Sequence, residues 1–245
     1  MRKLTIFEWF GIVMPMEDKY KAIKRAGFDG VMIWWGEDDV QKDDYKRHPR
    51  LAEKCGLYIE NVHTPFERAN DIWLDNLNGE TYVNNLIKYA SELPGYGIKT
   101  MVVHLTGGEN PPPMGDIGFD RIKRLLDAAD RNNIYVAVEN LKRADYTAAV
   151  FGRFTNPSLK FCYDSGHNAC TDAVVDYLSL YGNKLAALHL HDNDGKDDLH
   201  RAPFDGVADW QTIAGKLKAT GYAAPSPSKF IAAPKKRRTI LRTKS

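Results

Sequence analysis

The chain has few cysteines and no long apolar run. Only three of its 245 residues are cysteine (Cys55, Cys162 and Cys170), and they form no C-x-x-C pair. This excludes a disulfide framework or a thiolate zinc site, and it favours a reducing compartment. Apolar stretches stay well short of the roughly 18 residues of a membrane span. Glu8 interrupts the first apolar run, so we expect no cleaved secretion signal and a cytoplasmic protein without a membrane partner.

Two other signatures are missing: a nucleotide-binding motif and an excess of basic residues in the body of the chain. The sequence contains neither G-x-G-x-x-G nor a P-loop. The formal net charge is +2, but residues 223–245 carry seven basic groups and no acid, which leaves 27 basic and 32 acidic residues in 1–222. A body with a net charge of −5 does not favour a phosphate backbone, so we expect no nucleic-acid partner.

The chain does contain a regular alternation of β-branched, apolar runs with amphipathic segments. The expected strands are 4–10, 30–36, 57–63, 98–105, 134–140, 159–164 and 185–191. The expected helices are 17–28, 45–56, 81–93, 118–133, 145–154, 172–182 and 209–221. Seven βα units predict a parallel α/β sheet, and about 250 residues favour a (β/α)8 TIM barrel over a doubly wound open sheet.

Five consecutive expected strands end in an imidazole or a carboxylate. In chain order these residues are His63, His104, Glu139, Asp164 with His167 just beyond it, and His189 with His191. The carboxyl ends of barrel strands converge at one rim, so we expect one shared site. Each residue alone could have a structural role. Together they would crowd carboxylates and imidazoles at one rim, which is unfavourable unless a cation or a polar substrate binds there. Oxygen and nitrogen donors suit Mn²⁺, Zn²⁺, Mg²⁺ or Co²⁺.

The motifs ENVHTPF, VVHLT, AVEN, CYDSGH, LHLHDNDG, DLH and PFDG together resemble the xylose-isomerase-like barrel superfamily. This superfamily contains sugar phosphate isomerases and epimerases, and also endonuclease IV-type nucleases of apurinic sites. The resemblance to single-metal ketose epimerases implies Glu139, Asp164 and His189 as metal ligands. The resemblance to the trinuclear-zinc nucleases implies eight of nine ligands, namely His63, His104, Glu139, Asp164, His167, His189, Asp198 and His200.

The resemblance covers residues 1–222, and it also implies a last glutamate ligand on strand eight, within a GPLSLEV-like segment. Gly221-Tyr222 is present, but AAPSPSKFIAAP follows, with no carboxylate and with prolines that disturb a central strand. We therefore expect a barrel domain (1–222) and an aberrant basic tail (223–245), with strand eight and the final helix abnormal or missing. Codons compatible with residues 223–234 spell GPLSLEVYRRP in a shifted frame. The tail is then a candidate frameshift product; a genuinely divergent tail is the alternative.

Three functions follow from this resemblance. The first is a metal-dependent isomerase or epimerase of a sugar or sugar phosphate that acts through an enediolate, with Glu139 as acid/base and the missing strand-eight glutamate as its partner. The second is a trinuclear-zinc phosphodiesterase of abasic DNA, and the third is a non-catalytic sugar-binding barrel. Predicted substrate contacts are Trp34, Trp35, His191 and Asn140. His191 is interpreted either as facing the substrate or as supporting a metal ligand, and such aromatic rings are as often core. A homo-oligomer remains open.

Overall fold

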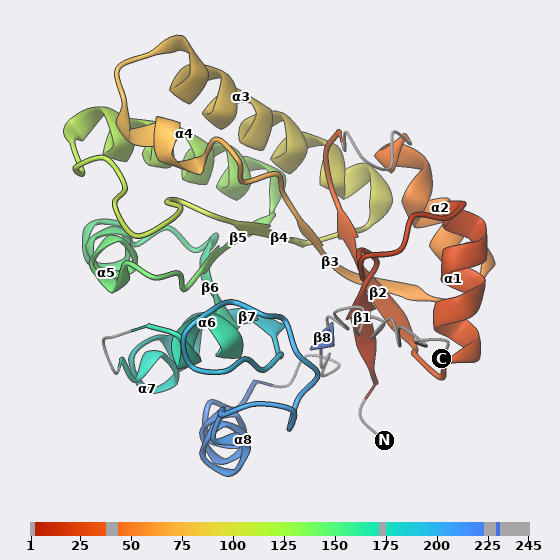
Figure 1. The fold of residues 1–245 in the computed structure, drawn as a ribbon. Coiled ribbons are helices and arrows are strands. Elements are labelled where there is room, and N and C mark those ends of the chain that lie inside the picture. The colour runs from red at the N-terminus through yellow and green to blue at the C-terminus, as the bar shows by residue number, and fades with distance from the viewer. Residues whose placement is uncertain (1–2, 38–43, 172–174, 223–228, 231–245) are drawn as a thin grey trace, which may run out of the picture.

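Parallel strands form one curled sheet at the centre of the molecule (Figure 1). The computed structural model describes residues 3–37, 44–171, 175–222 and 229–230. The strand order is β7-β6-β5-β4-β3-β2-β1-β8. Their bounds are β1 (Thr5–Phe7), β2 (Gly30–Trp34), β3 (Tyr58–His63), β4 (Thr100–Val103), β5 (Tyr135–Glu139), β6 (Leu159–Asp164), β7 (Leu185–His189) and β8 (Lys229–Phe230).

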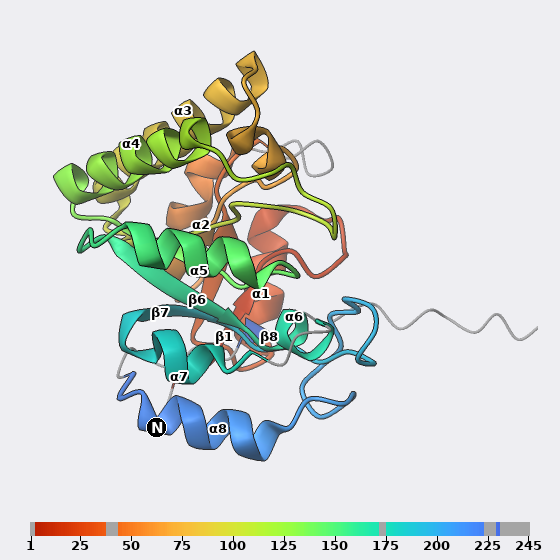
Figure 2. The same cartoon turned by 90° about the vertical axis from the view of Figure 1, so that its left-hand side faces the viewer.

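Helices cover the outer side of this sheet (Figures 1 and 2). They are α1 (Met16–Arg25), α2 (His48–Lys54), α3 (Leu77–Glu92), α4 (Asp116–Asn132), α5 (Ala144–Arg153), α6 (Ser165–Ala169), α7 (Tyr177–Tyr181) and α8 (Trp210–Ala219). Short 3-10 turns are η1 (Tyr45–Arg47), η2 (Ala69–Trp73), η3 (Leu93–Tyr96) and η4 (Gly182–Lys184). Neighbouring helices pack in pairs, α1 with α2, α3 with α4 and α7 with α8. In the described part of the chain, none is both long and apolar enough to cross a bilayer.

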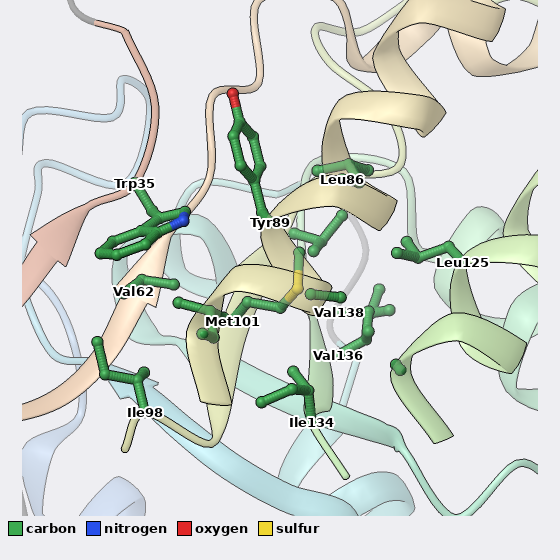
Figure 3. Packing of buried hydrophobic residues seen from close by; sticks show 14 of the residues in the cluster. Trp35, Val62, Leu86, Tyr89, Ile98, Met101, Leu125, Ile134, Val136 and Val138 are labelled. Atoms are coloured by element: carbon green, nitrogen blue, oxygen red, sulfur yellow. The ribbon is translucent and has the colours of Figure 1, made fainter. Parts of the chain in front are cut away.

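The two faces of the strands carry side chains of different size. Outward residues such as Met101 and Val138 pack against Leu86 of α3 and Leu125 of α4 in the main core (Figure 3). Inward residues are mostly small, and they form a separate buried cluster of Val102, Ala137, Cys162 and Ala187. Period-two alternation along each strand separates these sets. The large core therefore lies between sheet and helices.

The predicted alternation is confirmed, although six of the seven predicted strands are shorter than expected. The strand predicted over 4–10 is β1, and the strand predicted over 185–191 ends at His189. Beyond β7, the Ser165 hydroxyl accepts from His191 N (3.0 Å) and donates to His191 O (2.7 Å). The backbone of His191 is therefore hydrogen-bonded to a side chain instead of to a neighbouring strand. The turn α6 was not expected. The helix predicted over 172–182 is described only from residue 175, with α7 beginning after Asp176.

Strand eight is abnormal, as the sequence predicts. Its described part is only two residues long, with the parallel pairs Thr5↔Lys229 and Ile6↔Phe230 on β1. Within residues 3–37, 44–171, 175–222 and 229–230, no ladder joins β7 to β8, so the barrel is not closed by hydrogen bonds on that side. The rest of the predicted basic tail (223–245), including the final helix, lies outside the described residues.

Candidate metal and substrate site

Glu139, at the end of β5, is the centre of the site. Its side chain is 2% exposed, and three imidazoles lie within 3.2 Å of its oxygens. Oε2 lies 3.2 Å from His63 Nε2 and 2.9 Å from His104 Nε2, while Oε1 lies 2.8 Å from His189 Nδ1. These rings come from the ends of β3, β4 and β7, so the rim of the barrel brings together four residues that the sequence predicts as metal ligands.

Asp164, at the end of β6, is the second buried carboxylate. Oδ2 lies 3.5 Å from His189 Nδ1, so this imidazole faces both Glu139 and Asp164. His191 Nε2 lies 2.9 Å from Oδ1 and 3.0 Å from Oδ2 of the Asp164 carboxylate. The same carboxylate accepts the N–H of His167 (2.7 Å) and so begins α6. Asp164 is therefore both the N-cap of α6 and a predicted metal ligand. We call Glu139, Asp164, His63, His104 and His189 the inner cluster.

A more exposed group lies beside it. His191, Asp198 and His200 form this outer cluster, in which the His200 and His191 rings stack with centroids 4.4 Å apart. Asp198 Oδ2 lies 3.5 Å from His200 Nε2 and 3.2 Å from His167 Nε2. His167 also lies 3.4 Å from Glu139 Oε1, so its ring joins the two clusters. The structure thus gathers all eight predicted metal-type residues at one rim.

His63 presents a lone pair to Glu139. Its Nδ1 lies 2.9 Å from the Thr64 carbonyl oxygen, which only accepts, so Nδ1 carries the proton. Burial lowers the pKa of His63 to about 3, although Glu139 acts in the opposite direction. The neutral Nε2 therefore points a lone pair at Glu139 Oε2, 3.2 Å away. Two facing lone pairs repel each other unless a cation lies close to both.

The carboxylates of the site stay charged although they are buried. Burial would raise the pKa of Glu139 and of Asp164, but neighbouring imidazoles hold both pKa values well below their ordinary range. His167 shows the converse effect. Burial opposes its charge, but Asp164, Asp198 and Glu139 raise its pKa to about 10. Negative charge converges here, which is the electrostatic environment that a divalent cation requires.

The donor set fits such a cation. Glu139–Asp164–His167 and His63–Glu139–His189 each have donor atoms within 4.8 Å of one another, and all of these atoms are carboxylate oxygens or imidazole nitrogens. No thiolate takes part, which suits Mn²⁺, Zn²⁺, Mg²⁺ or Co²⁺. The facing lone pairs of His63 and Glu139 add an observation that a cation would explain.

Aromatic rings line the side of the site near β1 to β3. Trp34 stacks on His63 with centroids 5.7 Å apart and planes 6° from parallel. Phe66 is 40% exposed and lies over His104, with centroids 4.5 Å apart. Phe7 contacts Trp34 and His63 from β1. The structure therefore places the predicted substrate residue Trp34 beside the inner cluster.

The structure corrects the prediction for Trp35, and it places Asn140 and His191 directly against Asp164. Trp35 is fully buried against Tyr45 and Tyr96 in the main core, because adjacent residues of a strand point to opposite faces (Figure 3). Asn140 is also fully buried, and its carboxamide binds Asp164 N (2.7 Å) and Asp164 O (2.9 Å). His191 is 0% exposed behind Asp164. Trp35 belongs to the core, whereas Asn140 and His191 position Asp164.

Sequence reasoning missed the residues that hold this site in place. The hydroxyl of Tyr82 donates to the backbone carbonyl of His104 (2.8 Å). Gly166 leaves room for the imidazole of His191, because a Cβ there would lie 1.9 Å from its Cε1. The DSGH motif suggests a turn, but nothing in it shows which ring the glycine accommodates.

Comparison with known protein families shows which family the chain belongs to. The family profile described as "Xylose isomerase-like TIM barrel" matches residues 20–227. The chain belongs to this family. The match confirms the resemblance expected from the sequence, and it includes every ligand-type residue of both clusters.

Relatives and solved structures agree with this assignment. The chain is 37% identical over 118 residues to an uncharacterized protein, y4fM, of Sinorhizobium fredii, covering 44% of this chain but only 38% of that relative's length. It is 21% identical over 243 residues to the fructoselysine 3-epimerase of Shigella flexneri, covering 89% and 86% of the two chains. A solved D-tagatose 3-epimerase-like protein superposes with a TM-score of 0.75 at 19% identity, covering 93% and 90%. At 19% identity, this last comparison shows that the two chains share a fold.

Proposed function

We propose that this family member is a metal-dependent isomerase or epimerase of a sugar or sugar phosphate, acting through an enediolate. The observation that carries the proposal is that His189 Nδ1 faces two buried carboxylates, Glu139 Oε1 at 2.8 Å and Asp164 Oδ2 at 3.5 Å. These are the residue types that an epimerase of this family needs on strands five, six and seven. The relatives named as sugar epimerases support the same reading.

Each side chain has a defined task in this proposal. A divalent cation held by Glu139, Asp164 and His189 would supply positive charge beside the substrate oxygens where negative charge develops. Glu139 takes a proton from the substrate carbon, or returns it, and we assign this role to Oε2, which lies 2.9 Å from His104 Nε2. The ring of Trp34 forms an apolar wall for the substrate.

A second acid/base on the opposite side of the substrate is missing from this chain. We propose that the segment from residue 223 onward is read out of frame. The shifted reading puts its glutamate codon across the codons of Ser228 and Lys229, and β8 begins at Lys229. Sequencing the gene tests this interpretation: codons that cannot encode GPLSLEVYRRP in the shifted frame exclude it, and the tail is then genuinely divergent.

One observation favours a second candidate function. His63, His104, His167, Asp198 and His200 supply more donors than one metal ion needs, and the trinuclear nucleases use such a set. Cleavage of abasic DNA is therefore the alternative, which the net charge of residues 1–222 opposes. A non-catalytic sugar-binding barrel is the third reading, and the missing strand-eight glutamate supports it.

The test compares this chain with a corrected chain in which GPLSLEVYRRP follows Tyr222. Both are loaded with Mn²⁺, Co²⁺ or Zn²⁺ and assayed on a panel of ketoses and ketose phosphates, and on an abasic oligonucleotide. We expect the corrected chain to epimerise a ketose, and the present chain to be slower by roughly 10²- to 10⁴-fold. Nicking of the oligonucleotide with three zinc ions bound would support the nuclease. Sugar binding without turnover in both chains would support the binding protein.

A further inference from the structure

The segment that carries Asp198 and His200 contains no helix, and only one residue of it forms a β-bridge. It runs from residue 193 to residue 209, between β7 and α8, and we call it the 193–209 loop. His200 (φ 48°) and Phe204 (φ 71°) have left-handed backbones. This conformation is unfavourable for residues with a Cβ, and it persists only where surrounding contacts hold it. The outer cluster therefore depends on whatever holds this loop.

Asp192 contacts the loop at its beginning, its middle and its far end. Oδ1 accepts the N–H of Asn193 (2.9 Å) and that of Ala208 (3.0 Å), and Oδ2 accepts the indole N–H of Trp210 (2.7 Å). The backbone of Asp192 forms a two-bond antiparallel bridge with Arg201, at 2.9 and 2.7 Å. One fully buried carboxylate thus brings together parts of the chain that are up to 18 residues apart.

The packing around Asp192 shows that the far end of the loop is built to fit there. A Cβ on Gly206 would lie 2.1 Å from Asn193 O and 2.2 Å from Asp192 Oδ1, so only glycine allows this approach. Val207 N donates to Asn193 O (3.0 Å) at the same point. The Asn193 carboxamide donates to Gly166 O (2.6 Å), which fastens the start of the loop to α6. Space and hydrogen bonding are therefore both consistent with a closed loop.

We propose that Asp192 is a positioning residue that closes the 193–209 loop and so sets Asp198 and His200 against His167 and His191. The loop begins directly after Asp192, just beyond β7, and returns to the same carboxylate at Ala208, so its middle is constrained at both sides. Asp198 then reaches His167 Nε2 at 3.2 Å. The proposal concerns the placement of the loop, so it stands independently of the reaction that the site performs.

Hydrogen exchange on the full chain tests the proposal directly. Asp192→Asn keeps the size of the side chain but cannot accept equivalent hydrogen bonds at both oxygens. We expect amides of residues 193–208 to exchange faster by roughly tenfold or more, with β5 and β6 unchanged. Asp209→Asn is the matched control, because the Asp209 side chain accepts the N–H of Thr212 (3.0 Å) and so caps α8. The control should leave exchange in the loop unchanged.

A Co²⁺ titration of the same variants gives a second readout. Asp192→Asn should weaken Co²⁺ binding at the outer cluster by roughly tenfold to a hundredfold while binding at the inner cluster is retained. Gly206→Ala should reproduce both effects by a steric route, and it replaces Asp192→Asn if that variant does not fold. Unchanged exchange in the loop of both variants would overturn the proposal. So would faster exchange spread equally over β5 and β6, since that shows a general loss of stability.

Discussion

The inner and outer clusters use the same residue types but are built in opposite ways. Glu139 and His189 lie at strand ends, with side chains 2% and 1% exposed. Asp198 and His200 lie on the 193–209 loop, with side chains 29% and 36% exposed. Neighbouring strands position the first pair through the sheet ladder. A buried carboxylate, Asp192, positions the second pair.

This difference shows that one barrel rim positions its side chains in two ways, through neighbouring strands and through a loop closed on a buried carboxylate. The sheet ladder sets the inner donors together, since Glu139↔Cys162 and Asp164↔His189 are parallel pairs of neighbouring strands. The outer donors depend on few contacts and on two residues with left-handed backbones. Chemistry that needs fixed geometry is expected at the inner cluster, and we expect changes in the outer cluster to affect binding more than turnover.

Removing the charge of Glu139 should give the largest effect. Glu139→Gln in the corrected chain takes away both a metal-type ligand and the proposed proton acceptor. We expect turnover of the ketose substrate to fall by roughly 10³-fold or more while the fold is retained. Initial rates and circular dichroism measure the two. Glu109→Gln is the control, since Glu109 is exposed and pairs with Lys142 (2.8 Å) away from the inner cluster. Full activity of Glu139→Gln would remove Glu139 from the mechanism.

Asp198→Asn should have an intermediate effect that is confined to the outer cluster. Asp198 is the carboxylate shared by His167 and His200. Its loss should weaken a second bound ion or raise the substrate KM by roughly 10- to 100-fold, with a smaller change in kcat. Metal titration and steady-state kinetics separate the two. Asp197→Asn, one residue earlier in the same loop, is the control. A drop in kcat as large as that of Glu139→Gln would mean that the clusters act as one unit.

Acid should destabilise the metal-free protein through His63. Its pKa is lowered to about 3 in the folded chain, against about 6.5 when unfolded. Between these values the unfolded chain binds the extra proton, so this contribution is complete above pH 6.5 and is lost as pH falls. We expect about 1 kcal/mol per pH unit from this group. Urea unfolding from pH 7.5 to 5, with His63→Gln as comparison, measures it. Equal slopes for both proteins would show that His63 is not held neutral.

Replacing Trp34 should give the smallest effect. Trp34→Leu removes the ring that stacks on His63 but leaves the inner donors in place. We expect substrate binding to weaken by about 0.5–1.5 kcal/mol, seen as a higher KM. Trp35→Leu is the contrasting variant, because Trp35 is buried in the core and should lower stability instead. If Trp35→Leu raised KM without changing stability, the assignment of the two rings would be reversed.

Much of the fold and of the inner cluster could be predicted because both follow local rules. Periods of 2 and 3.6 residues identify strands and helices, and the ends of parallel strands meet at one rim. His63, His104, Glu139, Asp164 and His189 were predicted in this way. The functions of Asn140, Ser165 and Asp192 were not, because each depends on a hydrogen bond to a segment distant in sequence or to backbone groups that local patterns do not specify.

The sequence by itself determined the parallel α/β alternation, the donor types at the rim, and the break in strand eight, since these depend on residue identity and short-range spacing. Tertiary structure decided that Trp34 faces the site and Trp35 the core, that neutral His63 turns a lone pair to Glu139, and that Asp192 closes the 193–209 loop. The physical reason is that side-chain direction and loop closure depend on long-range contacts, whose energies exist only once distant segments have come together.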